Sequence, residues 1–134
     1  MSDSSDVVAG TNATATQINN IRKDLVLGQN VMGTETYAAT TTIDWSDKTK
    51  GKIRTVTLTG NPTIAFSNAV AGQALLIRLT QDGTGSRTVT WPSINWTGGS
   101  APLLTTTASK TDAILIICTV AASTYDGYVA GKNI

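Results

Sequence analysis

The chain has 134 residues and a mass of 13.9 kDa, which suits one domain and excludes two full ones. Ten basic and nine acidic residues give a net charge of +1, which argues against a nucleic-acid-binding protein held by phosphate neutralisation. The chain contains no histidine, so the commonest general base and the commonest metal ligand are both missing. We therefore expect a non-enzymatic protein with no metal ion and no cofactor.

Threonine is unusually frequent, at 24 of 134 residues, whereas charged residues make up only 14% of the chain. Threonine is β-branched and favours strands, so the composition predicts a mainly β protein. The low charge has two explanations that the composition does not separate. The chain either presents a polar β-surface to solvent or keeps much of its surface against other subunits.

Residues 1–36 are predicted to form an N-terminal attachment segment that contains one short helix over 15–27. Thr14 and Gln17 fit a capping box at the start of this helix. Three apolar residues at helical spacing share one face, namely Ile18, Ile21 and Leu25. An isolated helix of this length is marginal in water, so we expect it to dock on its own β-domain or on another protein.

From residue 37 onward the hydrophobic period falls to two, which is typical of strands. Strands are predicted at 40–45, 54–59, 63–66, 75–79, 87–91, 113–120 and 124–130. The Asp82-Gly83 turn is expected to close a hairpin between 75–79 and 87–91. The run 113–120 is apolar on both faces, which indicates a central strand covered on both sides, with Cys118 as a buried small hydrophobe.

Short strands at this spacing predict a β-sandwich or jelly-roll-like domain over residues 37–134. A β-helix is disfavoured because the Thr-x-Thr pairs recur at irregular intervals and no fixed repeat period is found. The chain shows no signal-peptide pattern and no apolar run long enough to cross a membrane, which predicts a protein made soluble in a cytoplasm.

Three polar motifs are interpreted as turns or loops. Residues 82–85 contain Gly-x-Gly but lack the third glycine and the following helix of a phosphate-binding loop. Asp44 and Asp47 are expected to cap a turn, because nothing in the sequence holds them across a substrate-sized gap. The basic cluster over 48–54 is expected to be a solvated loop, with contact to an acidic partner as the alternative.

The candidate ligand-binding or interface aromatic residues are Trp45, Trp91 and Trp96. A tryptophan buries a large area and most often anchors a core or a subunit interface. Stacking against a sugar ring is the alternative interpretation, and it applies best to Trp96 beside the Gly98-Gly99 loop.

One stretch of the chain resembles a known family. Residues 72–92 read GQALLIRLTQDGTGSRTVTWP and are followed by Trp96, Gly98-Gly99, Pro102, a threonine-rich stretch and an apolar strand. This order of elements, over about 56–130, resembles a module of tailed-bacteriophage virion proteins found in tail fibres and small fibre or decoration proteins. Residues 8–25 also resemble the start of such proteins.

The resemblance implies a structural component of a tailed-phage virion, a small homotrimeric fibre or decoration protein. Its N-terminal segment would attach it to a capsid or tail protein, with the attachment or oligomer interface at Ile18, Ile21 and Leu25. The alternative is a carbohydrate-binding or host-surface-binding module with a receptor-binding role. Neither nucleic acid nor membrane insertion is expected.

Overall fold

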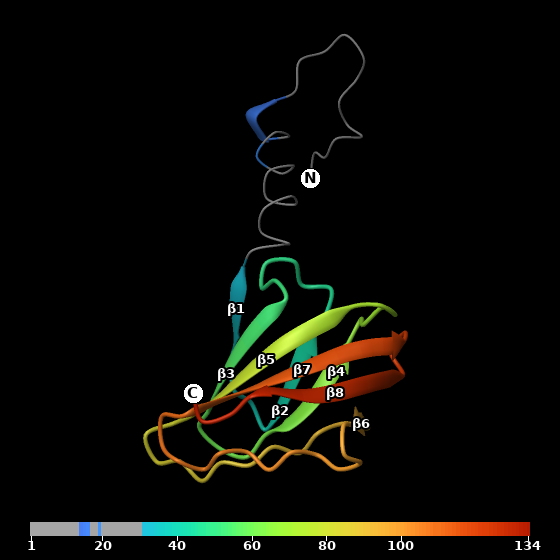
Figure 1. Ribbon diagram of the computed structural model, residues 1–134. Coiled ribbons are helices and arrows are strands. Elements are labelled where there is room, and N and C mark those ends of the chain that lie inside the picture. Colours follow the sequence, from blue (N-terminus) through green and yellow to red (C-terminus); the bar gives the residue numbers. More distant parts are fainter. Residues whose placement is uncertain (1–13, 17–18, 20–30) are drawn as a thin grey trace.

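The computed structural model of the chain describes residues 14–16, 19 and 31–134 (Figure 1). The helical stripe of Ile18, Ile21 and Leu25 lies outside the described residues, as does most of the helix predicted over 15–27. Residues 31–134 are mainly β, which confirms the predicted class. Among the described residues, no helix has the length and apolar character needed to cross a membrane.

Two sheets make up the domain. The strands are β1 (Met32–Glu35), β2 (Thr40–Asp44), β3 (Ile53–Leu58), β4 (Thr63–Ser67), β5 (Ala74–Gln81), β6 (Asn95–Trp96), β7 (Thr111–Val120) and β8 (Thr124–Gly131). The larger sheet has the order β1-β3-β5-β7-β8-β6, and the smaller sheet pairs β2 with β4. β1 belongs to the larger sheet although it lies within residues 1–36, which the sequence analysis assigned to the attachment segment.

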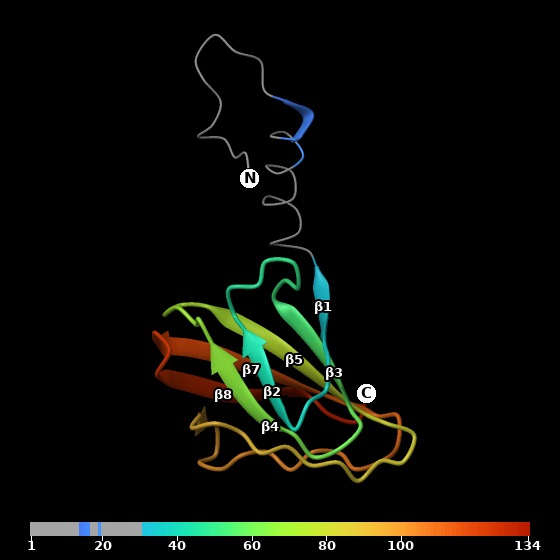
Figure 2. The ribbon, with the colours of Figure 1, turned by 180° about the vertical axis from the view of Figure 1, so that it is seen from behind.

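The first five strands alternate between the two sheets, so the chain winds around the core (Figures 1 and 2). β1, β3 and β5 pair in parallel in the larger sheet, and β2 and β4 pair in parallel in the smaller sheet. Met32 pairs with Ile53, 21 residues later, and Ile53 pairs with Leu76, 23 residues later. This parallel winding departs from the antiparallel pairing of a jelly roll and is the winding of a β-helix, which the sequence analysis disfavoured.

The predicted hairpin between 75–79 and 87–91 is wrong. β5 pairs with β7 in antiparallel fashion, and residues 87–91 contribute only an isolated parallel bridge from Thr90 to Thr63. The buried side chain of Gln81 explains the difference. It accepts a hydrogen bond from the Arg87 N–H at 2.8 Å and donates one to the Arg87 carbonyl at 2.9 Å. Arg87 therefore has its backbone groups satisfied without a strand partner.

The two sheets share one hydrophobic core. Its most deeply buried aliphatic members include Ile43, Leu58, Ile64, Leu75, Ile77, Leu79, Ile114 and Ile116, with the buried Cys118 that the sequence predicted. β7 lies between β5 and β8 as a central strand, and its inward residues alternate with the half-buried Leu115 and Ile117. The prediction that β7 is covered on both faces is confirmed on the inner face, and on the outer face it holds only for Thr111 and Ala113.

An ion pair is buried at the end of the domain where β1, β2 and β3 meet. Arg54 of β3 is 1% exposed, and its Nη1 lies 2.7 Å from the Glu35 carboxylate of β1. Lys50 approaches the other Glu35 oxygen at 2.9 Å. The remaining guanidinium N–H groups donate to backbone carbonyls of Asp44, Asp47 and Gly51. The basic cluster is therefore not simply a solvated loop, because Arg54 and Lys50 turn inward.

Replacing Arg54 with alanine should lower the free energy of unfolding by about 3–5 kcal/mol, because the Glu35 carboxylate would stay buried without its main partner. Chemical denaturation followed by circular dichroism measures the change. Lys52→Ala is the matched control, since Lys52 is exposed and its loss should change stability by less than about 0.5 kcal/mol. An Arg54→Ala variant as stable as the control would contradict the stabilising role of this ion pair.

Candidate functional site

A groove of about 540 Å³ runs between β8 and the loop that follows β6. Its apolar lining comes from Trp96, Ala101, Pro102, Leu103, Tyr128 and Val129, and its hydroxyl groups come from Thr97 and Ser100. The volume lies in the range of small-molecule sites. This groove is the candidate binding site of the domain.

The segment that forms one wall of the groove is hydrogen-bonded directly to β8. Asn95 and Trp96 pair in parallel with Asp126 and Gly127, and Thr97 donates from both its N–H and its hydroxyl to the Gly127 carbonyl at 3.1 Å. The chain then reverses at Gly98-Gly99, where both residues have φ near +85°, a conformation that glycine adopts without strain. The sequence-predicted glycine loop therefore shapes the groove.

The Trp96 ring is held in a fixed position. Trp91 packs edge-on against it, with ring centroids 5.2 Å apart and planes at 69°. On the β8 side, a Cβ atom built at Gly127 would lie 2.5 Å from the Trp96 ring, so the ring packs directly on the strand backbone. Both tryptophans are half-buried and pack against the core, and only Trp96 lines the groove.

The chemistry of the groove suits an uncharged ligand with an apolar face. Among the described residues, none that lines the groove carries a charge. Tyr128 is 40% exposed and Leu103 is 87% exposed, so the rim offers accessible apolar surface. The Gly127 carbonyl faces β6, so the backbone groups of Val129, two residues further on, face the same side beyond the end of β6. They supply hydrogen-bonding groups beside the aromatic wall.

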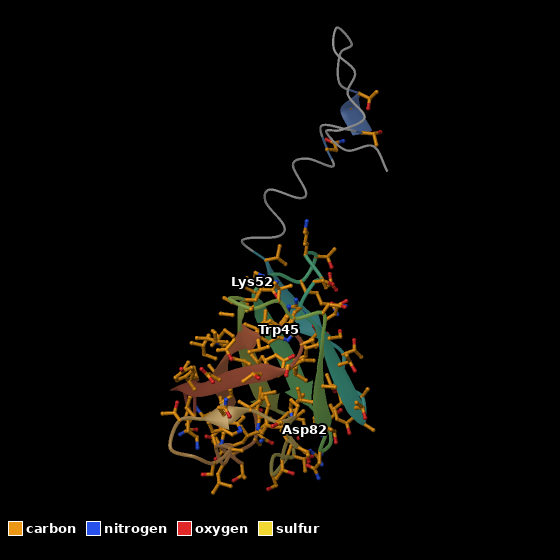
Figure 3. All side chains as sticks on the ribbon, turned by 90° about the vertical axis from the view of Figure 1, so that its right-hand side faces the viewer. Trp45, Lys52 and Asp82 are labelled. Carbon is orange, nitrogen blue, oxygen red and sulfur yellow. The ribbon has the colours of Figure 1, made fainter. Side chains whose placement is uncertain are left out.

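Trp45, by contrast, is a core residue. It is 2% exposed and packs against Phe66 at 5.4 Å and Tyr125 at 5.7 Å between ring centroids. Figure 3 shows it inside the domain, between the ends marked by Lys52 and Asp82. Burial raises the pKa of the Tyr125 hydroxyl in this cluster. We therefore assign Trp45 to the core and remove it from the candidate ligand or interface residues.

Asp44 and Asp47 cap turns, as predicted. The Asp44 carboxylate accepts bonds from the Ser46 hydroxyl at 2.7 Å and from Asn68 at 3.0 Å, and these bonds lower its pKa. The Asp47 carboxylate accepts the Thr49 hydroxyl and N–H, with the hydroxyl the main cause of its lowered pKa. Within the described residues, no group of three histidine, cysteine or acidic side chains is placed to hold a metal ion.

The outer face of the larger sheet is a second surface of interest. Nothing in residues 31–134 forms a layer over it, whereas β2 and β4 lie behind the sheet (Figures 1 and 2). An apolar row crosses five strands of this face in register: Met32, Ile53, Leu76, Leu115 and Tyr128. The row cannot be recognised in the sequence, because its residues come from five separate segments that only the strand register aligns.

Comparison of the chain with protein-family models, with curated proteins and with solved structures found no significant match. The resemblance to tailed-phage virion modules therefore stays a prediction.

Gly127→Ala should displace the Trp96 ring and destabilise the domain by about 1–3 kcal/mol, because the added Cβ overlaps a ring that is also packed against Trp91. Near-ultraviolet circular dichroism and chemical denaturation report the two effects. Gly83→Ala is the matched control, since a Cβ there meets nothing within 4 Å. An unchanged tryptophan spectrum in Gly127→Ala would show that the ring is not fixed by the strand.

Proposed function

We propose that this chain is a non-enzymatic structural component of a tailed-phage virion, a small homotrimeric fibre or decoration protein. In this proposal, residues 1–36 contain the attachment to a capsid or tail protein, and the β-domain projects from or caps the particle. The proposed location is the virion, after synthesis in the host cytoplasm.

The observation that carries the proposal is the uncovered apolar row on the larger sheet. Met32 is 62% exposed and Ile53 is 38% exposed, and both lie in register with Leu76 at the centre of the sheet. A contiguous apolar patch on a small domain marks a surface for protein contacts. The low content of charged residues, 14%, fits a chain whose surface is shared with other subunits.

The non-enzymatic part of the proposal is supported by the chemistry of the side chains. The chain has no histidine, and Cys118 is buried in the core. The carboxylates of Asp44 and Asp47 are engaged in their own turns. The buried Asp112 accepts backbone N–H bonds from Thr105 at 2.6 Å and Asn133 at 2.9 Å. These acidic groups have structural partners rather than a free path to a substrate.

Replacing both Ile21 and Leu25 with aspartate should abolish incorporation into virions, because two charges would interrupt the predicted apolar stripe. The amount of the variant in purified particles, measured by immunoblot, tests this. Asn19→Asp with Asn20→Asp is the matched control, since it adds the same charge to the polar side of the predicted helix. Normal incorporation of the Ile21/Leu25 variant would sink the attachment role of this stripe.

The groove supports a second candidate function, binding of carbohydrate at a host surface. A fixed tryptophan with exposed apolar neighbours, hydroxyl groups and no charge suits the apolar face and hydroxyls of a neutral sugar. This function is compatible with a place on the virion, because a fibre or decoration protein is exposed to the host.

Leu103→Ser should weaken sugar binding about tenfold while leaving the fold intact, because Leu103 lines the groove and is almost fully exposed. An array of neutral and acidic glycans identifies the ligand, and titration of the best hit measures affinity. Val70→Ser, an exposed apolar position outside the groove, is the control. An array without hits, or equal affinity of Leu103→Ser and wild type, would count against sugar binding in this groove.

A further inference from the structure

We infer that the outer face of the larger sheet is the interface between copies of this chain, and that Arg78 of one copy pairs with Asp126 of the next. The inference rests on the proposed function, because it names the partner that covers the apolar row. It goes further because it assigns the contacting surface, and it names the charged pair that fixes how one copy is aligned with the next.

The face consists of the outward residues of β1, β3, β5, β7 and β8. Leu75, Ile77 and Leu79 point into the core, so the alternate residues of β5, including Leu76 and Arg78, point outward. The apolar row continues on both sides of Leu76 and ends at Tyr128 of β8. Ile117, one row away on β7, widens the row at the centre of the sheet.

Beyond the apolar row the face is built from threonine. Thr57 of β3, Thr80 of β5 and Thr111 of β7 lie in register, and the hydroxyls of Thr80 and Thr111 are 2.8 Å apart. Thr57 and Thr80 reach the surface of the face, whereas Thr111 is buried at 6% exposure. The outer face therefore combines an apolar row with a neighbouring row of short threonine side chains.

The size of the face matches the need of a specific interface. Strands four to ten residues long, at about 4.8 Å spacing and about 3.3 Å rise per residue, give the five strands a projected area on the order of 600 Å². A standard interface buries about 800 Å² of accessible surface on each partner. Because side chains protrude from the sheet, the accessible area of the face is larger than its projected area. The whole face is therefore comparable to one side of a standard interface, and in a ring each of the two neighbouring copies would cover about half of it.

Two charged residues stand among the outward positions of these five strands, one of each sign. Arg78 lies on β5, and Asp126 lies on β8, with β7 between them. Among the described residues, Arg78 makes no ion pair, and Asp126 meets only the Asn95 amide, at a long 3.4 Å. The face is thus complementary to itself in charge as well as in apolar character.

The placement of the two charges favours a second copy as the occupant. In a closed ring of identical subunits, one half of a face meets the other half of the neighbouring face. Arg78 lies on the central strand β5 and Asp126 lies on the flanking strand β8, so a contact in which β5 of one copy meets β8 of the next joins opposite charges. Such a pair contributes more to specificity and register than to affinity, which comes from the apolar row.

The test uses the purified full chain and its solution mass, measured by light scattering on a sizing column. Wild type should give three times 13.9 kDa, as the proposed trimer requires. Arg78→Asp and Asp126→Arg should each weaken association by about tenfold or more, because each places like charges together. The double variant should restore association. Lys48→Asp, an exposed site outside the face, is the control for the change of charge.

A second pair of variants tests the apolar row. Leu76→Thr with Leu115→Thr places β-branched, strand-favouring residues at these two outer positions, so the monomer should stay folded by circular dichroism while its mass falls to 13.9 kDa. An oligomeric mass that this folded variant retains would overturn the interface, and so would a monomeric wild type. A double charge variant that fails to recover would overturn the Arg78–Asp126 pair.

These outcomes are separate from the test of the proposed function. Self-association is measured in purified protein, whereas the virion role is measured by incorporation into particles. A chain that enters virions but stays monomeric in solution would refute the interface and the trimeric state, and would leave the virion role standing. A chain that associates through this face but is absent from virions would refute the proposed function alone.

Discussion

The buried guanidinium of Arg54 is the interaction on which the winding of this domain depends. It joins the Glu35 carboxylate of β1 to carbonyls at the end of β2 and in the loop before β3, so it closes the first coil of the chain. A charge taken out of water at this point is tolerated only when every N–H finds an acceptor. The loop over 46–51 must therefore keep one conformation, and β3 can then pair with β1 in register.

The sequence predicts the inner half of this structure well, because burial of one face imposes a period of two. The strands at 40–45, 54–59, 63–66, 75–79, 113–120 and 124–130 are found within a few residues of their predicted limits. Hydrophobic periodicity does not indicate which strands pair with one another. Met32 and Ile53 are 21 residues apart and Thr63 and Thr90 are 27 apart, so loops of unequal length hide the repeat of the coils.

The two surfaces were predicted unequally for the same reason. Trp96 and the Gly98-Gly99 loop were identified from residue type, and both shape the groove, but its other wall comes from Tyr128 and Val129 of β8. No local signal links 96–103 to 127–129, because the link is a short parallel pairing across the chain. The apolar row likewise draws on segments far apart in sequence. Residue type alone thus identified the wall of the groove that Trp96 and the following loop form, and it did not identify the wall that β8 forms.

Tyr128 connects the groove with the sheet face, because it ends the apolar row and also lines the groove. Copies that pack through the outer face would therefore carry their grooves at the border of the interface, in a fixed relative arrangement. If the uncharged groove binds a sugar as proposed, one copy alone makes only a small contact with it. Three grooves held by one assembly convert weak contacts into avidity without any new contact. The proposed assembly through the outer face and the proposed sugar binding in the groove are therefore physically compatible.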